Sequence, residues 1–87
     1  MADARKEYTF TVVVVPEEPE FGGYVVEVPA LSGCLSQGET VEEALAMIRD
    51  AMEVWIEATR RCSEIPADRN PEDLEEGARV FRVTVTV

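Results

Sequence analysis

The 87-residue sequence contains no histidine, two cysteines, and only eight lysine and arginine residues against eighteen acidic residues. Without histidine, the chain lacks the side chain that most often serves acid–base catalysis and metal binding near neutral pH. A net charge of −10 disfavours binding to nucleic acid or to an anionic membrane surface, because each phosphate contact requires a cation. We therefore expect no direct nucleic-acid partner. An acidic surface of this size suits a basic protein partner, or it serves solubility.

Long apolar runs are also missing, since no segment approaches the roughly 18–20 residues that a membrane helix requires. Residues Met1–Glu7 are charged and lack a small-residue cleavage site after them, so no secretory leader is expected. A disulfide between Cys34 and Cys62 is not expected, because the helix predicted below over residues 41–62 would hold the two cysteines too far apart. Two cysteines are also too few ligands for a metal site. These features predict one cytoplasmic domain over residues 1–87, without membrane association, metal or cofactor.

Four segments have the composition or position of β-strands: residues 8–15 (YTFTVVVV), 24–28 (YVVEV), 34–37 (CLSQ) and 80–87 (VFRVTVTV). Successive side chains of a strand point to opposite faces of the sheet, so alternate positions share one face. The more apolar of these faces is predicted to pack on the core. Its members are Tyr8, Phe10, Val12, Val14, Tyr24, Val26, Val28, Phe81, Val83 and Val85.

A helix is predicted from Val41 to about Cys62. Thr40 and Glu43 have the spacing of a capping box, in which Thr40 caps the helix and the Glu43 side chain accepts a hydrogen bond from the Thr40 backbone N–H. One apolar stripe of this helix is expected to face the sheet: Val41, Leu45, Ile48, Met52, Trp55 and Thr59. A second stripe lies roughly 90° around the axis and consists of Met47, Ala51, Val54 and Ala58. Either a second copy of the chain or the segment 63–78, folded back, could cover this second stripe.

The order β-β-β-α-β predicts a two-layer α+β domain, with an antiparallel three-stranded meander and one long helix. A connection through a helix favours a parallel return, so the fourth strand is expected beside strand one and parallel to it, in the sheet order 3-2-1-4. Residues 63–78 are polar and rich in turn-forming residues. Asn70-Pro71 resembles the start of a short helix, so one or two helical turns are expected there.

The run Gly22–Glu57 (GGYVVEVPALSGCLSQGETVEEALAMIRDAMEVWIE) resembles the HicB-like antitoxin domain. The matching features are the Gly-Gly-Tyr entry to the second strand, its Val-Pro end, the Gly-Cys turn, the Gln-Gly-Glu-Thr cap and the Glu-Glu-Ala-Leu helix opening. This resemblance implies a truncated ribonuclease-H-like fold. It also implies a protein that neutralises a small basic HicA-like toxin, which cleaves RNA. The chain resembles a stand-alone version without the C-terminal DNA-binding segment of many family members, so no operator binding is expected.

The implied ribonuclease-H-like fold raises the question of catalysis. Two-metal phosphoryl transfer needs several convergent carboxylates to hold its ions. The first strand offers only threonine and valine in its middle, and the last strand offers no acid. Glu43 is explained by the capping box, and Glu27 by an outward strand position. The sequence therefore predicts no catalytic residue and no enzymatic activity.

The predicted function is a non-catalytic protein-binding module, either an antitoxin or a relative of one, that occludes a small basic HicA-like toxin. The alternative is a self-associating structural or regulatory domain, a homodimer or higher oligomer, with no toxin partner. Unpaired backbone groups on the edge strands would favour pairing between two chains. The candidate interface residues are Met47, Ala51, Val54, Ala58, Arg82, Thr84 and Thr86.

Overall fold

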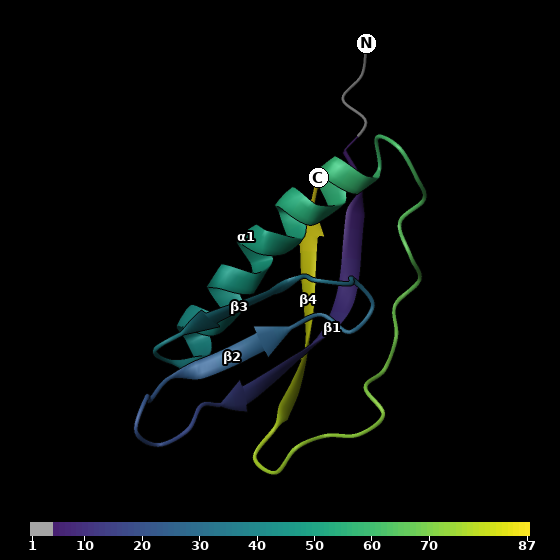
Figure 1. The fold of residues 1–87 in the computed structure, drawn as a ribbon. Helices are drawn as coiled ribbons and strands as arrows, with labels where there is room; N and C mark the ends of the chain where they lie inside the picture. Colours follow the sequence, from purple (N-terminus) through teal and green to yellow (C-terminus); the bar gives the residue numbers. More distant parts are fainter. Residues whose placement is uncertain (1–4) are drawn as a thin grey trace.

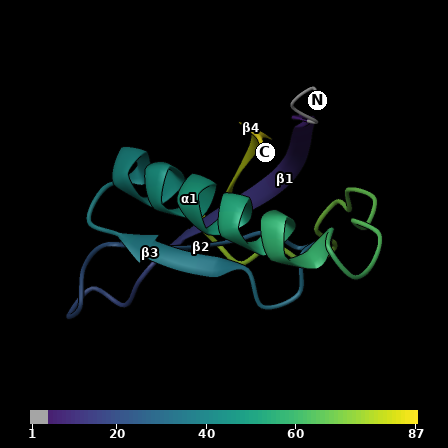
Figure 2. The same cartoon turned by 90° about the horizontal axis from the view of Figure 1, so that it is seen from above.

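The computed structural model describes residues 5–87, in which one helix packs across one face of a four-stranded sheet (Figure 1). The stretch Met1–Glu7, where no secretory leader is expected, lies partly outside the described residues. The elements in chain order are β1 (Glu7–Pro16), β2 (Tyr24–Glu27), β3 (Leu35–Gly38), α1 (Val41–Thr59) and β4 (Arg79–Thr86). The sheet order is β3-β2-β1-β4, and Figure 2 shows α1 lying across the sheet. The predicted two-layer α+β class and sheet order are confirmed.

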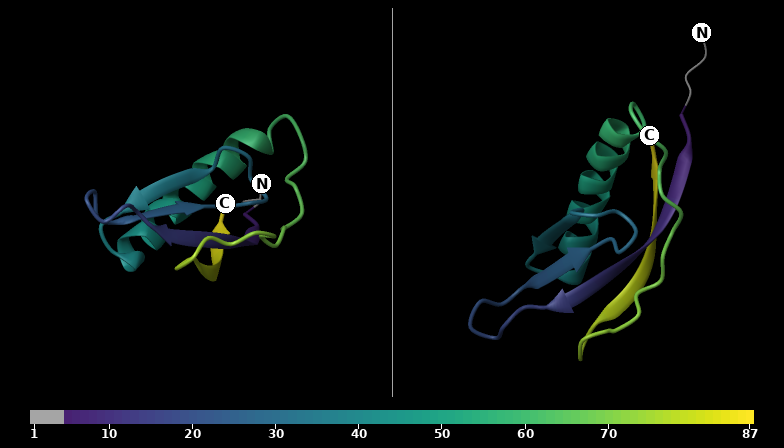
Figure 3. Two further views of the ribbon diagram at one scale, coloured as in Figure 1. Left: turned by 60° about the horizontal axis from the view of Figure 1, so that its bottom comes forward. Right: turned by 45° about the vertical axis from the view of Figure 1, so that its right-hand side comes forward.

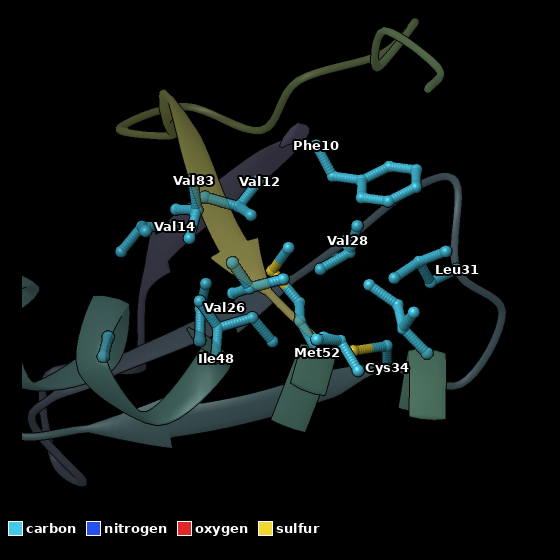
Figure 4. Packing of buried hydrophobic residues seen from close by; sticks show 14 residues of the cluster. Phe10, Val12, Val14, Val26, Val28, Leu31, Cys34, Ile48, Met52 and Val83 are labelled. Atoms are coloured by element: carbon cyan, nitrogen blue, oxygen red, sulfur yellow. The ribbon is translucent and has the colours of Figure 1, made fainter. Parts of the chain in front are cut away.

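The predicted core face of the sheet is also confirmed. All ten of its members either belong to the buried cluster or pack against it. Val12 and Val26 are completely buried, and Val14 is 1% exposed. Figure 4 shows their side chains converging with those of Leu31, Cys34 and the helix. A period of two therefore located the core face correctly, because the pleat is regular and α1 covers this face of the sheet.

The face of α1 that meets this core differs from the predicted stripe. Its fully buried residues are Ala44, Ile48, Met52 and Ile56, each 0% exposed. Ile48 and Met52 belong to the predicted stripe, whereas Ala44 and Ile56 do not. The other members of the predicted stripe, Val41, Leu45, Trp55 and Thr59, are only partly buried. The buried residues repeat every four positions and face the sheet directly. The other residues of the predicted stripe lie beside this row and contact the sheet only at the edge of the helix–sheet interface.

The helix begins as predicted at Thr40, whose hydroxyl accepts a hydrogen bond from the Glu43 N–H at 3.0 Å. The Glu43 carboxylate returns a bond to the N–H of Glu39, one residue before the expected Thr40 amide. The first bond satisfies a donor that the helix start leaves free, and the second ties the residue before the cap to the first turn. The helix ends at Thr59, three residues before the predicted end.

The predicted direction of β4 is wrong, because β4 runs antiparallel to β1, with Tyr8 opposite Val85 and Val14 opposite Arg79. At its C-terminal end, α1 lies beside the end of β4, where the Arg60 guanidinium donates to the Val87 carbonyl at 3.0 Å. A strand that started there would have run parallel to β1. The chain instead travels back along the sheet through residues 60–78 before β4 begins, which reverses the strand (Figure 3).

Residues 60–62 form a turn directly after α1, and the rest of the segment 60–78 contains no helix. The helical turns expected within residues 63–78 are therefore absent. The segment runs extended past the sheet face opposite α1. There the Asp68 carboxylate accepts hydrogen bonds from the Thr11 N–H at 2.9 Å and from the Thr11 hydroxyl at 2.8 Å. Thr11 is only 2% exposed, and Val13 on the same face is 5% exposed. This segment therefore crosses the sheet in an extended conformation and covers part of the face opposite α1.

Asp68 is therefore expected to link stability to pH. Partial burial raises the pKa of its carboxyl, but the hydrogen bonds from Thr11 and the Arg69 N–H, with the charge of Arg82, outweigh burial and leave the pKa below its usual value. A group with a lowered pKa in the folded state stabilises the fold above its unfolded pKa, and this contribution is lost as the pH falls through the folded pKa.

Replacement of Asp68 by asparagine is expected to lower the free energy of unfolding by about 1–2 kcal/mol at neutral pH. The deficit should shrink as the pH falls below about 4, where the wild-type carboxyl also becomes protonated. Urea denaturation across this pH range measures it, with the exposed Asp73→Asn in the same segment as the control. A deficit that stayed constant with pH would show that the charge of Asp68 does not contribute.

Candidate protein-binding surface

A groove of about 600 Å³ lies between the β1–β2 loop and the N-terminal half of α1. Phe21, at the tip of the loop, is 75% exposed, and Met47 on the helix is 44% exposed. Tyr24, at the start of β2, is half-buried between them and the core. A single exposed apolar side chain is ordinary on a protein surface. Three that line one hollow offer an apolar floor for a partner's side chain.

The β1–β2 loop that carries Phe21 is closed by backbone hydrogen bonds. The N–H groups of Phe21 and Gly22 donate to the Glu18 carbonyl at 2.9 and 3.0 Å, and the Glu17 N–H donates to the Gly23 carbonyl at 3.0 Å. Gly22 and Gly23 have φ values of 71° and 77°, which side-chain-bearing residues rarely adopt. These hydrogen bonds therefore fix the backbone of the loop that presents the Phe21 side chain.

The other wall of the groove depends on close contact between β3 and α1. A Cβ atom on Gly38 would lie 2.5 Å from the Ala44 nitrogen, so no larger residue fits there without a shift of the helix. A Cβ atom on Gly23 would lie 2.8 Å from the Gly38 carbonyl oxygen. Gly23 and Gly38 thus allow the start of β2, β3 and the first turns of α1 to approach one another closely beside the groove.

The charge around the groove is of one sign. No lysine or arginine occurs in the sequence between Lys6 and Arg49, whereas this stretch contains Glu7, Glu17, Glu18, Glu20, Glu27, Glu39, Glu42 and Glu43. Glu17, Glu39 and Glu43 line the groove itself. The β1–β2 loop and the start of α1 lie at the same end of the molecule, at the lower left of Figure 1. Six of these eight glutamates, all but Glu7 and Glu27, belong to the β1–β2 loop or to the start of α1, so acidic side chains gather around the groove.

The helix residues of the predicted interface line two different hollows. Met47 belongs to the groove beside Phe21. Val54, which is 70% exposed, and Ala58 line a separate shallow hollow with Glu53, Glu57 and Arg61. Ala51, between them, is half-buried and packs against the core.

The strand residues of the predicted interface lie on β4, on the face of the sheet opposite the helix. Arg82 is 3.9 Å from the Asp68 carboxylate, and the Thr84 hydroxyl is 2.7 Å from that of Thr9. Thr86 is exposed. Because α1 covers the other face, the structure does not bring these three residues together with the predicted helix stripe.

The outer edge of β4 ends the sheet. Lys6 and Val87 exchange both backbone hydrogen bonds, at 2.9 and 3.0 Å. Hydrogen-bonded and non-hydrogen-bonded pairs alternate in an antiparallel ladder, so the backbone groups of Thr84 and Thr86 point away from β1. The Arg49 guanidinium donates to the Thr84 carbonyl and covers part of this edge.

The cysteines and the acidic side chains of residues 5–87 do not form a reactive-thiol site or a metal site. Both cysteines are free, as predicted, with Cys34 buried and Cys62 exposed. Burial raises the pKa of the Cys34 thiol, which disfavours the reactive thiolate. Within residues 5–87, no three cysteine or acidic side chains are grouped so that they could hold a metal ion. No helix in this part of the chain is long and apolar enough to cross a bilayer.

The groove and its most exposed apolar residue, Phe21, were not predicted from the sequence. Phe21 lies in a loop between a Pro-Glu pair and two glycines, where no strand or helix period assigns its side chain to the core or to the surface. Tyr24 was assigned only to the core, and Met47 only to a helix stripe. The available signal was an aromatic residue inside an acidic loop, but its partner Met47 lies 26 positions further along the chain.

Comparison with known proteins gives consistent matches. The family described as "HicB_like antitoxin of bacterial toxin-antitoxin system" matches residues 10–82. A UPF0150 protein of Thermoplasma acidophilum is 44% identical over 64 residues, which cover 72% of this chain and 90% of that protein. A UPF0150 protein of Synechocystis is 49% identical over 39 residues, 45% of this chain and 53% of that protein. One from Archaeoglobus fulgidus is 33% identical over 51 residues, 59% of this chain and 74% of that protein. No solved structure matches.

Proposed function

Because the chain belongs to the HicB-like antitoxin family of bacterial toxin–antitoxin systems, we propose that it is a non-catalytic binding protein that neutralises a small basic toxin by covering it. The HicA-like class of RNA-cleaving toxins is the expected partner, as the family resemblance implies. The observation that carries this proposal is the acidic groove of Phe21, Tyr24 and Met47. An apolar anchor surrounded by one sign of charge is an arrangement that recognises an oppositely charged protein.

A binding role is also supported by the chemistry of the described residues. The chain has no histidine, and the middle of β1 and all of β4 carry no carboxylate. The acid–base and metal-binding groups of a nuclease would therefore have to come from the loops, from α1, or from Glu7 and Glu27 at the strand ends. Within residues 5–87, no such cluster is present. Neutralisation by occlusion requires only a complementary surface, which the groove supplies.

The test uses the product of a neighbouring reading frame of about 60–80 residues with net positive charge, the size and charge that complement this chain. RNA cleavage by that purified protein is measured with and without equimolar amounts of the 87-residue chain. We expect cleavage to stop when the chain is present, and the chain alone to leave RNA intact in magnesium or manganese. Continued cleavage, the absence of such a reading frame, or cleavage by the chain alone would contradict the proposal.

A second candidate function is self-association without a toxin. It is favoured by the outer edge of β4, where the backbone groups of Thr84 and Thr86 point away from the sheet and Val80 is 46% exposed. Pairing of two such edges would extend the sheet across a homodimer. Light scattering during size-exclusion chromatography would then give twice the chain mass of 9.7 kDa. A monomer at all concentrations would contradict this candidate function.

A further inference from the structure

We infer that the groove between the β1–β2 loop and α1 is the docking site for a basic segment of the partner protein, which places one apolar side chain between Phe21 and Met47. Lysine or arginine residues on either side of that apolar side chain then face Glu17 and Glu39. This inference rests on the proposed function, since it assigns the contact surface for the toxin.

The apolar part of the groove has the properties of an interface anchor. Phe21 and Met47 are exposed, yet each is held by ordered backbone, the first by the closed loop and the second by α1. A partner therefore loses little free energy in ordering this surface. The groove volume of about 600 Å³ is also within the range of sites that enclose a small ligand or a few side chains.

The charge selects a basic occupant. Glu43 is engaged in the helix cap, but the carboxylates of Glu17 and Glu39 remain at the rim. Three other hollows in the described part of the chain each include an arginine: Arg69 in one, Arg5 and Arg60 in another, and Arg61 in the third. No lysine or arginine lines the groove of Phe21. A cationic segment of a partner therefore meets carboxylates without a neighbouring arginine in this groove. In the three other hollows, an arginine of the chain itself would repel it.

The first test needs no toxin. A synthetic peptide with lysines on both sides of a central leucine is titrated into the isotope-labelled chain, and backbone amide shifts are followed by NMR. We expect the largest shifts at Phe21, Gly22 and Met47. A matched peptide with glutamine in place of lysine should bind about tenfold more weakly. Shifts centred elsewhere, equal binding of the two peptides, or no binding would overturn the inference.

The second test uses the purified basic neighbour protein and variants of the chain. Phe21→Ala should weaken binding about thirtyfold, the loss typical of an anchor residue. Leu74→Ala removes a 49% exposed side chain outside the groove and should change affinity less than about threefold. The double change Glu17→Gln and Glu39→Gln should slow association at low salt, whereas Glu72→Gln with Glu75→Gln, in the 60–78 segment, should not.

The outcomes of the two tests separate the inference from the proposed function. If the toxin binds the wild-type chain and Phe21→Ala equally well, the docking site is wrong while the antitoxin role stands. If no toxin binds but the lysine peptide shifts Phe21 and Met47, the antitoxin role fails while the groove stands as a site for basic segments.

Discussion

Replacement of Ile48 by alanine is expected to lower the free energy of unfolding by about 2–5 kcal/mol. Ile48 is 0% exposed and lies in the row of α1 that faces the sheet, so its removal leaves a cavity at the contact between the two layers. A chain of 87 residues has a total stability of roughly 4–13 kcal/mol. This one substitution therefore removes a large fraction of the stability of the fold.

The matched control for Ile48→Ala is Val54→Ala, which removes an apolar side chain from the same helix at a position 70% exposed. Its effect should stay within about 0.5 kcal/mol, because little buried surface is lost. Urea denaturation followed by circular dichroism compares the two variants at constant pH. Equal losses would contradict the assignment of the buried helix face.

The second large effect is expected for Gly38→Ala. The added Cβ would lie 2.5 Å from the nitrogen and 2.8 Å from the Cα of Ala44, atoms of the helix backbone that cannot rotate away. The first turns of α1 must therefore move from β3, at a cost of about 1–3 kcal/mol. This loss is opposite in sign to the ordinary gain from replacing glycine within a strand.

Gln37→Ala is the control for Gly38→Ala, because Gln37 is the neighbouring residue of β3 and is exposed. It should have a small effect on the free energy of unfolding. If the movement of α1 also carries Met47 away from Phe21, Gly38→Ala should weaken binding of the lysine peptide as well. A Gly38→Ala variant as stable as Gln37→Ala would contradict the close contact of β3 and α1.

The parts of the fold that follow from local rules were predictable from the sequence. Alternation along β1 and β4 identified the face that packs on the core, because side chains at alternate positions of a regular pleat share one face. Thr40 and Glu43 identified the helix start, because a capping box satisfies free N–H groups within four residues. These features depend on neighbouring residues alone.

The parts that failed depend on distant contacts. The direction of β4 depends on where the segment 60–78 goes after α1, and a polar segment without a period gives no sign that it runs the length of the sheet. Its path is fixed in part by the hydrogen bonds of Asp68 with Thr11, 57 residues away in sequence. The missed burial of Ala44 and Ile56 has a related cause, since the angle at which α1 meets the sheet is a property of the packed layers.

The candidate site was only partly predictable for the same reason. The net charge of −10 indicated a basic partner, but composition does not show where the charge gathers. The groove forms only when the β1–β2 loop and α1 meet through Gly23, Gly38 and Ala44. The predicted interface residues were instead divided between the helix and the opposite sheet face, and their role in self-association stays a prediction.

The most direct test of an acidic binding module is calorimetric titration of the chain with the basic product of the neighbouring reading frame at two salt concentrations. We predict saturable binding with an affinity that falls as salt rises from about 50 to about 300 mM, because the contact pairs carboxylates with cations. The same titration with Phe21→Ala should show the weaker binding described above. Absence of binding heat at both salt concentrations and at more than one temperature, or an affinity unchanged by salt, would contradict the account.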